Sequence, residues 1–168
     1  MGSIPPTKPY IIRTHRPGDI GWIIHRLSVL YDQERIRLGT RFEGLVAEIA
    51  ANFIEDYEPE VERCWVAERD DGHILGSIML VQDRTSKSNA AKIRLLLVEP
   101  TARGLGLGRT LVKTATSFAR KVGYARVGLW TQSTLTSARH IYASEGFKLM
   151  WRLNMLLLGL RLLVSFGN

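Results

Sequence analysis

The sequence predicts one α/β domain, built on a sheet that is antiparallel at first and crossed by helices later. The 168 residues are enough for one domain with a buried core. Helical and strand-like hydrophobic periods follow one another in the order ααβββαβαβ, without an internal repeat. Apolar residues make up 45% and charged residues 23%, which is typical of a globular protein.

Two amphipathic helices are expected first. Residues 17–34 place apolar side chains on one face, with Asp19 as the N-cap, and residues 40–57 form a second stripe of the same period. Residues 1–9 lack the apolar core of a signal peptide and are expected to be a loose lead-in. The acidic run over residues 55–62 is expected to be a solvated turn.

Three strands come next. Asp71 and Gly72 separate two apolar runs within residues 64–83, which is a strong β-hairpin signal. The run over residues 91–98 is nearly continuous in apolar residues and stops before Pro100, as a buried central strand would.

The second half alternates helix and strand. A helical face over residues 107–122 ends at Gly123, and residues 125–131 predict a strand. Residues 133–147 predict a helix that closes at Gly146, and residues 147–150 begin another strand. The domain is therefore expected over residues 10–150, followed by an atypical apolar tail over residues 151–168.

The sequence of the tail is compatible with several structures. Its longest apolar run, about 12 residues, contains Arg161 and is too short to span a bilayer. An interfacial helix, a buried terminal strand, a dimer element and a tail altered by mis-splicing or a frameshift are all compatible with it. No membrane span is expected, and a homodimer is one open possibility.

Charge is distributed unevenly along the chain. Residues 1–84 carry 10 Lys and Arg against 14 Asp and Glu, whereas residues 85–168 carry 13 against 2. The second half would therefore attract an anionic ligand. A nucleic-acid partner is not expected, because the basic residues form no run, DNA-binding motif or aromatic stacking pattern. The single cysteine, Cys64, permits neither a disulfide framework nor a cysteine metal site, and it fits a cytoplasmic or nuclear protein without a metal.

The most informative segment is EPTARGLGLGRTLV, residues 99–112, between a predicted buried strand and a helix. It matches neither a Walker A loop nor a dinucleotide-binding G-x-G-x-x-G, but it fits R-x-x-G-x-G from Arg103 through Gly108. Glycines let the backbone approach a ligand closely, and amides at a helix start point outward with partial positive charge. The segment therefore predicts a pyrophosphate site, the alternative being a tight turn without a ligand.

Two motifs in this order resemble the GCN5-related N-acetyltransferase (GNAT) family. LLLVEPTARGLGLGRTLV resembles the family's acetyl-CoA signature, and ARHIYASEGF resembles its second signature, a helix with a tyrosine that ends in Gly-Phe. The resemblance implies a mixed, mostly antiparallel sheet that splays at the cofactor strand, with about four flanking helices. Several further segments resemble the acetyltransferase half of proteins that fuse a MarR-type helix-turn-helix to this domain. About ten residues precede the first strand, so we do not expect a regulator's role.

The resemblance also implies an acetyl-CoA site and no metal. The backbone of Leu96, Leu97 and Val98 would pair with the pantetheine arm, and the Val98 amide would steady the thioester oxyanion. The residues that would surround the pyrophosphate are Arg103, Gly104, Leu105, Gly106, Leu107, Gly108 and Arg109.

Three side chains are candidates for chemistry or acceptor binding. Tyr142 occupies the place of the family's general acid, which protonates the departing CoA thiolate, although a core aromatic residue would also fit there. Glu99 follows the cofactor strand and is a candidate base, alongside a water chain or a base from elsewhere. His25 lies on the first helix, where family members shape the acceptor pocket, or it is an ordinary helix residue.

The expected function is transfer of an acetyl group from acetyl-CoA to a primary amine of a small molecule or peptide, by direct attack in a ternary complex. Two departures favour an alternative, a catalytically weak or inactive acyl-CoA-binding module. Leu135 stands where the family often has Asn, and the tail lacks the polar turn that normally precedes a last strand.

Overall fold

A seven-stranded mixed sheet forms the centre of the molecule. The computed structural model describes residues 9–33, 39–132, 136–152 and 159–166. The strands are β1 (Tyr10–Thr14), β2 (Arg63–Arg69), β3 (Ile74–Gln82), β4 (Ala90–Val98), β5 (Arg126–Gln132), β6 (Lys148–Arg152) and β7 (Gly159–Ser165). The helices are α1 (Asp19–Gln33), α2 (Gly39–Glu55), the short 3-10 helix η1 (Pro100–Ala102), α3 (Leu107–Lys121) and α4 (Thr136–Ser144).

The strand order is β1-β2-β3-β4-β5-β7-β6. Within the described residues, β4 and β5 are the one parallel pair, and the other neighbours are antiparallel. The predicted fold class is therefore confirmed, including a mostly antiparallel sheet with four α-helices. β1 lies at one edge and begins at Tyr10, where about ten residues were expected before the first strand, although the order of elements predicted from hydrophobic period omits it.

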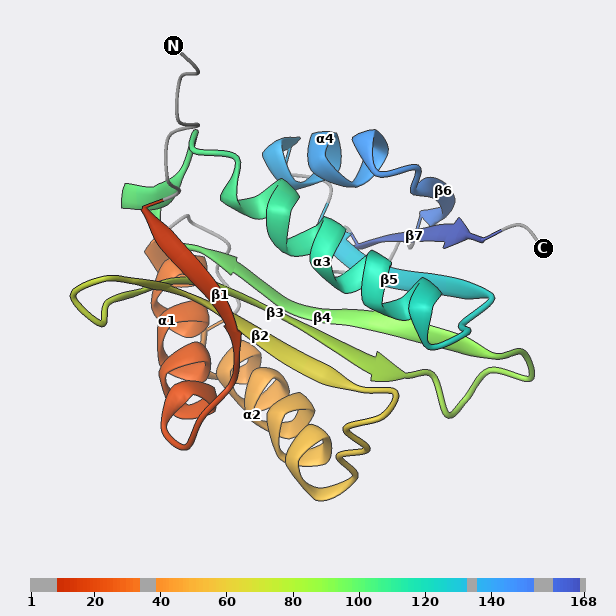
Figure 1. Cartoon of the computed structure of the whole chain (residues 1–168), viewed down its shortest axis with the longest axis horizontal. Helices are drawn as coiled ribbons and strands as arrows, with labels where there is room; N and C mark the ends of the chain where they lie inside the picture. The colour runs from red at the N-terminus through yellow and green to blue at the C-terminus, as the bar shows by residue number, and fades with distance from the viewer. Residues whose placement is uncertain (1–8, 34–38, 133–135, 153–158, 167–168) are drawn as a thin grey trace, which may run out of the picture.

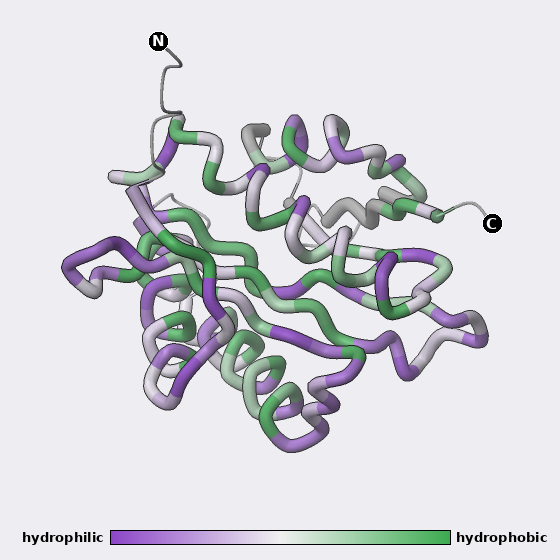
Figure 2. The backbone as a smooth tube through the Cα atoms, in the orientation of Figure 1, coloured by the Kyte–Doolittle hydropathy of each residue, from purple (hydrophilic) through white to green (hydrophobic). Residues whose placement is uncertain are grey.

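Helices cover both faces of the sheet (Figure 1). α1 and α2 pack on one face through Ile23, Leu27 and Val46, and α3 and α4 pack on the other through Leu111, Val112 and Tyr142. We call these the α1/α2 face and the α3/α4 face. Figure 2 shows the hydrophobic residues concentrated along the central strands and the hydrophilic ones at the loops and outer helix surfaces.

Asp19 acts differently from the expected N-cap. It is the first residue of α1, and the amide of Trp22 donates a hydrogen bond to the carbonyl of Gly18, one residue earlier. The Asp19 carboxylate instead accepts hydrogen bonds from the Arg16 amide at 2.6 Å and from the Arg13 guanidinium at 2.6 Å. Burial opposes its ionisation, but these donors lower its pKa below the usual value. Asp19 therefore ties the turn before α1 to β1.

Glu62 corrects the expectation that the whole acidic run is solvated. Its side chain is buried, and its carboxylate accepts hydrogen bonds from the Gln82 amide at 2.9 Å and from Arg84 at 2.7 Å. A buried charge needs such partners, because leaving it unpaired costs several kcal/mol, on the order of 3–5. The other four acids of the run, Glu55, Asp56, Glu58 and Glu60, are exposed.

The tail takes the buried-strand alternative. β6 crosses the expected boundary at residue 150, and β7 inserts between β5 and β6. Seven consecutive residues of β7, from Gly159 to Ser165, pair with β5. Its apolar composition follows from this position, since a strand with neighbours on both sides contributes to the core; Val164, for example, packs in the core of the α3/α4 face.

Removing β7 should therefore unfold the sheet. We expect a chain that ends at Arg152 to lose cooperative thermal unfolding, or to unfold at least about 10 °C lower, because β5 loses its antiparallel partner and β6 its one neighbour among the described strands. Circular dichroism during heating measures this. A chain that ends at Phe166 keeps β7 and serves as the control. Equal melting of the Arg152 truncation and the full chain would show that β7 is dispensable.

Candidate functional site

The site is built where β4 and β5 part. Their parallel pairing covers four residue pairs, from Ala90–Arg126 to Ile93–Leu129. Beyond that point, the register of β4 against β3 shifts between Arg94 and Leu97, and Leu95 adopts a positive φ of 49°. Such a bulge bends a strand and sharpens its twist, so it turns β4 away from β5. The splay expected at the cofactor strand is present.

The parted strand exposes backbone polar groups toward the gap. The amide of Glu99 donates a hydrogen bond to the carbonyl of Leu75 at 2.8 Å, on the β3 side. Because neighbouring residues of a strand direct their N–H and C=O groups to opposite sides, those of Val98 face away from β3. This is the orientation needed for an added extended ligand, and for the expected role of the Val98 amide. Leu96 is half-buried on the α3/α4 face, and Leu97 is buried against α1 and α2.

The glycine segment forms a turn that leads directly into α3. Gly104 and Gly106 have φ values of +80° and +74°, which non-glycine residues rarely adopt, and Gly106 is the N-cap residue of α3. No side chain caps this helix start, so the first-turn amides are available to an external acceptor. Arg103, Leu105 and Arg109 are exposed around the turn. Arg103 also interacts within the protein.

Leu107 and Gly108 serve packing as well as the turn. Leu107 is buried, so its backbone, and not its side chain, can face a ligand. A Cβ on Gly108 would lie 2.8 Å from Cδ1 of Ile141. Glycine at this position therefore lets the start of α3 approach α4 closely, which fixes the helix that carries Tyr142.

Tyr142 is buried with 4% of its surface exposed, and it packs edge-on against Phe147 with 5.7 Å between ring centroids. Burial, and secondarily the neighbouring phenol of Tyr31, raises the pKa of Tyr142 above its usual value. The phenol therefore stays protonated at neutral pH, as a proton donor must. Tyr142 belongs to the core of the α3/α4 face, whereas Tyr31 lies on α1 at the opposite face.

Glu99 lies at the end of β4 in a two-pronged ion pair. Arg26 of α1 donates from Nε to Oε1 at 2.6 Å and from its terminal nitrogen to Oε2 at 2.8 Å. Both groups are largely shielded, with side-chain exposures of 25% and 13%. The pair fastens α1 to the end of β4, and any proton that Glu99 takes up must arrive at oxygens that Arg26 already contacts.

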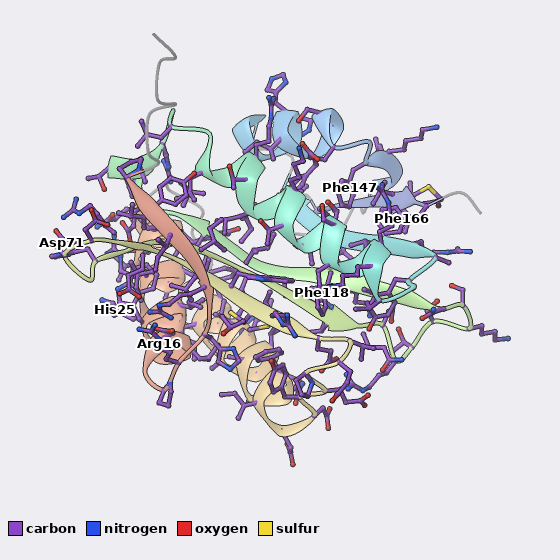
Figure 3. The ribbon with its side chains drawn as sticks, viewed as in Figure 1. Arg16, His25, Asp71, Phe118, Phe147 and Phe166 are labelled. Atoms are coloured by element: carbon purple, nitrogen blue, oxygen red, sulfur yellow. The ribbon has the colours of Figure 1, made fainter. Side chains whose placement is uncertain are left out.

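His25 is exposed on α1, at the left of Figure 3. It lines a cavity of about 320 Å³ between α1 and α2, together with Asp32, Glu43 and the stacked rings of Tyr31 and Phe42. The ring centroids of Tyr31 and Phe42 are 4.2 Å apart. The cavity is therefore lined by α1 and the residues at the start of α2, on the α1/α2 face.

Sequence reasoning missed the partners that α1 supplies. Arg26 and Glu99 are 73 residues apart, and no local pattern joins them. In the sequence, Tyr31 is only another apolar residue in the hydrophobic stripe of the first amphipathic helix. Leu135 falls outside the described residues.

The described part of the chain contains no group of three or more His, Cys, Asp or Glu side chains placed to hold a metal ion. None of its helices combines the length and the apolar composition needed to cross a membrane.

Comparison with solved structures shows the same fold. A GCN5-related N-acetyltransferase from Kribbella flavida matches with a TM-score of 0.74 and 19% identity, over 94% of this chain and 98% of that one. A protein from Salmonella typhimurium, solved with its cofactor acetyl-CoA, matches with a TM-score of 0.73 and 16% identity, over 94% of each chain. At these identities the likeness establishes the fold alone.

Sequence relatives are more similar but longer. N-acetyltransferase 8B from Homo sapiens is 34% identical over 101 residues, which is 58% of this chain and 44% of that protein. Mycothiol acetyltransferase from Beutenbergia cavernae is 34% identical over 84 residues, which is 49% of this chain and 27% of that protein. The matched region thus spans less than half the length of both relatives.

The family model for the acetyltransferase (GNAT) family matches residues 22–147, which runs from α1 through the Gly-Phe that ends the second signature. The parted strands, the glycine turn and the buried tyrosine all lie within these residues. The chain belongs to the GNAT acetyltransferase family.

Proposed function

We propose that this protein transfers an acetyl group from acetyl-CoA to a primary amine. One juxtaposition carries the proposal: the unpaired edge of β4 at Val98 runs directly into the glycine turn that opens α3. An extended thioester arm can pair with the first while its pyrophosphate reaches the second. Membership of the GNAT family and the acetyl-CoA in the Salmonella typhimurium structure support the same cosubstrate.

The residues of the turn fit a pyrophosphate. The first-turn amides of α3 carry the partial positive charge of a helix N-terminus, and Arg103 and Arg109 add full charges at its rim. The Val98 amide, directed into the gap, is placed to donate to an oxyanion on the acetyl carbon.

Tyr142 is the proposed general acid. Its phenol is buried and stays protonated, so it can protonate the thiolate that leaves when the amine attacks. We propose Glu99 as the group that receives the proton of the amine, because it follows the cofactor strand and lies on the α1 side. Its ion pair with Arg26 favours the competing view that it only holds α1 in place.

A module that binds acyl-CoA without turnover is the second candidate. It would have the same cofactor surface, so binding alone does not separate the two. His25 as part of the acceptor pocket, a cytoplasmic or nuclear location, a homodimer, and a relation to MarR-fused acetyltransferases stay predictions.

Replacing Gly106 by Glu should abolish acetyl-CoA binding. The change forces a side chain into a φ of +74° and puts a negative charge at the α3 N-terminus, so we expect at least about a hundredfold weaker binding by isothermal titration. Gly72→Glu is the matched control, because Gly72 has a φ of +84° in the β2–β3 hairpin. Retained binding by a folded Gly106→Glu variant would contradict the proposed pyrophosphate site.

Replacing Tyr142 by Phe should reduce turnover and spare binding. We expect kcat to fall by about 10²–10⁴-fold, with the Kd for acetyl-CoA unchanged, because the variant loses a proton donor. Thiol release with an amine library measures kcat. Since the pKa of Tyr142 is raised, the wild-type rate should not decline on the alkaline side until the pH passes the ordinary tyrosine value. Unchanged kcat would leave Tyr142 as a core aromatic residue.

The role of Glu99 is separated by two variants. If Glu99 receives the proton, Glu99→Gln should lower kcat by at least about tenfold more than Arg26→Gln, since only the first removes the base. If the ion pair only positions α1, both variants should lose activity and melting temperature equally. Steady-state kinetics and thermal unfolding of the two variants decide between these outcomes.

A further inference from the structure

Arg94 and Trp130 stand at the point where β4 and β5 separate. The last paired residues of the two strands are Ile93 and Leu129. Arg94 and Trp130 are the next residue on each strand, so they flank the narrow end of the gap in which the proposed acetyl donor lies.

Both side chains project on the α1/α2 face. Arg94 is the register partner of Met79, and cross-strand partners share a face. Met79 is buried in the core beneath α1 and α2. On β5, Leu129 belongs to the core of the α3/α4 face, so its neighbour Trp130 points the other way, where it is 45% exposed.

Arg94 is a shielded cation without a partner in the described part of the chain. Arg13, Arg26 and Arg84 each form a close ion pair with a carboxylate, but no hydrogen bond or ion pair joins Arg94 to the described residues. Asp83 attracts it from a distance, and that carboxylate is already bound to Lys92 at 2.7 Å.

The surroundings of Arg94 make this charge costly. Burial lowers the pKa of its guanidinium below the usual value, and the attraction of Asp83 only partly offsets the effect. A guanidinium in such a place gains most from a planar, two-oxygen anion, which it can bind through two parallel hydrogen bonds.

The acceptor is expected on this same face. The turn that would bind the pyrophosphate opens α3, which packs on the α3/α4 face. The donor would fill the gap itself, so an amine must approach from the α1/α2 face, where α1 brings Arg26, Tyr31 and the cavity beside His25.

The geometry points to Arg94 as the residue that binds a carboxylate of the acceptor. The substrate class is then an amine that carries a carboxylate close to its amino group, such as an amino acid, with Trp130 packing against its nonpolar part. This inference rests on the proposed acetyl transfer, because that reaction supplies the amine.

The experiment compares L-amino acids offered as free acids and as primary amides. In the wild type we expect kcat/KM for the preferred free acid to exceed that for its amide by at least about tenfold, because a guanidinium–carboxylate pair is lost in the amide. Arg94→Gln should abolish this preference with little change for the amide, and Arg94→Lys should restore part of it. Arg126→Gln is the matched control, since Arg126 lies on the same face at the paired end of β5 and should keep the preference.

A second readout does not depend on turnover. The free acids should raise the melting temperature of CoA-loaded wild type and of Arg126→Gln, and should leave that of Arg94→Gln unchanged. Equal effects of acids and amides on the wild type, or a preference that survives in Arg94→Gln, would overturn the inference. Failure of the proposed function would be seen separately, as wild-type protein that does not bind acetyl-CoA or does not release CoA with any amine. In that case, the role of Arg94 is decided by whether free acids shift the melting temperature of the unloaded protein.

Discussion

The separation of β4 from β5 after four residue pairs is the constraint on which the rest of the site depends. A sheet interior normally satisfies every backbone donor and acceptor, and unpaired groups are costly when buried. Here the bulge at Leu95 turns one strand away, and the polar groups near Val98 face a gap. An extended ligand can satisfy those groups, which makes this break in the sheet the proposed binding surface.

Several parts of the fold hold this gap in place. Arg26 and Glu99 bind α1 to the end of β4. The absence of a Cβ at Gly108 lets α3 approach α4, which positions Tyr142 from the other side. β7 supports β5 along seven residues and so fixes the second wall. Side chains from the α1/α2 face and from the α3/α4 face therefore support the gap between β4 and β5, and the gap belongs to neither core alone.

Arginines serve different purposes on the two faces of the sheet. The proposed phosphate site at the α3 N-terminus would use exposed arginines and backbone amides, which cost little because water reaches them. On the opposite face, the shielded cations Arg13 and Arg26 are neutralised by the carboxylates of Asp19 and Glu99. Arg94 differs from these arginines, because it forms no ion pair with a described residue. Its position where β4 and β5 part is the basis for its proposed role in binding the acceptor.

The sequence by itself determined the order of most elements, the hairpin at Asp71 and Gly72, and the turn from Arg103 to Gly108, because hydrophobic period and glycine placement are local properties. Tertiary structure alone decided the rest. The tail could not be assigned from its composition, since an apolar run becomes a strand only when β5 and β6 leave it a place. The ion pair of Glu99, the placement of Tyr142 beside Tyr31, and the unpaired state of Arg94 depend on side chains far apart in the chain, and no local pattern encodes such distances.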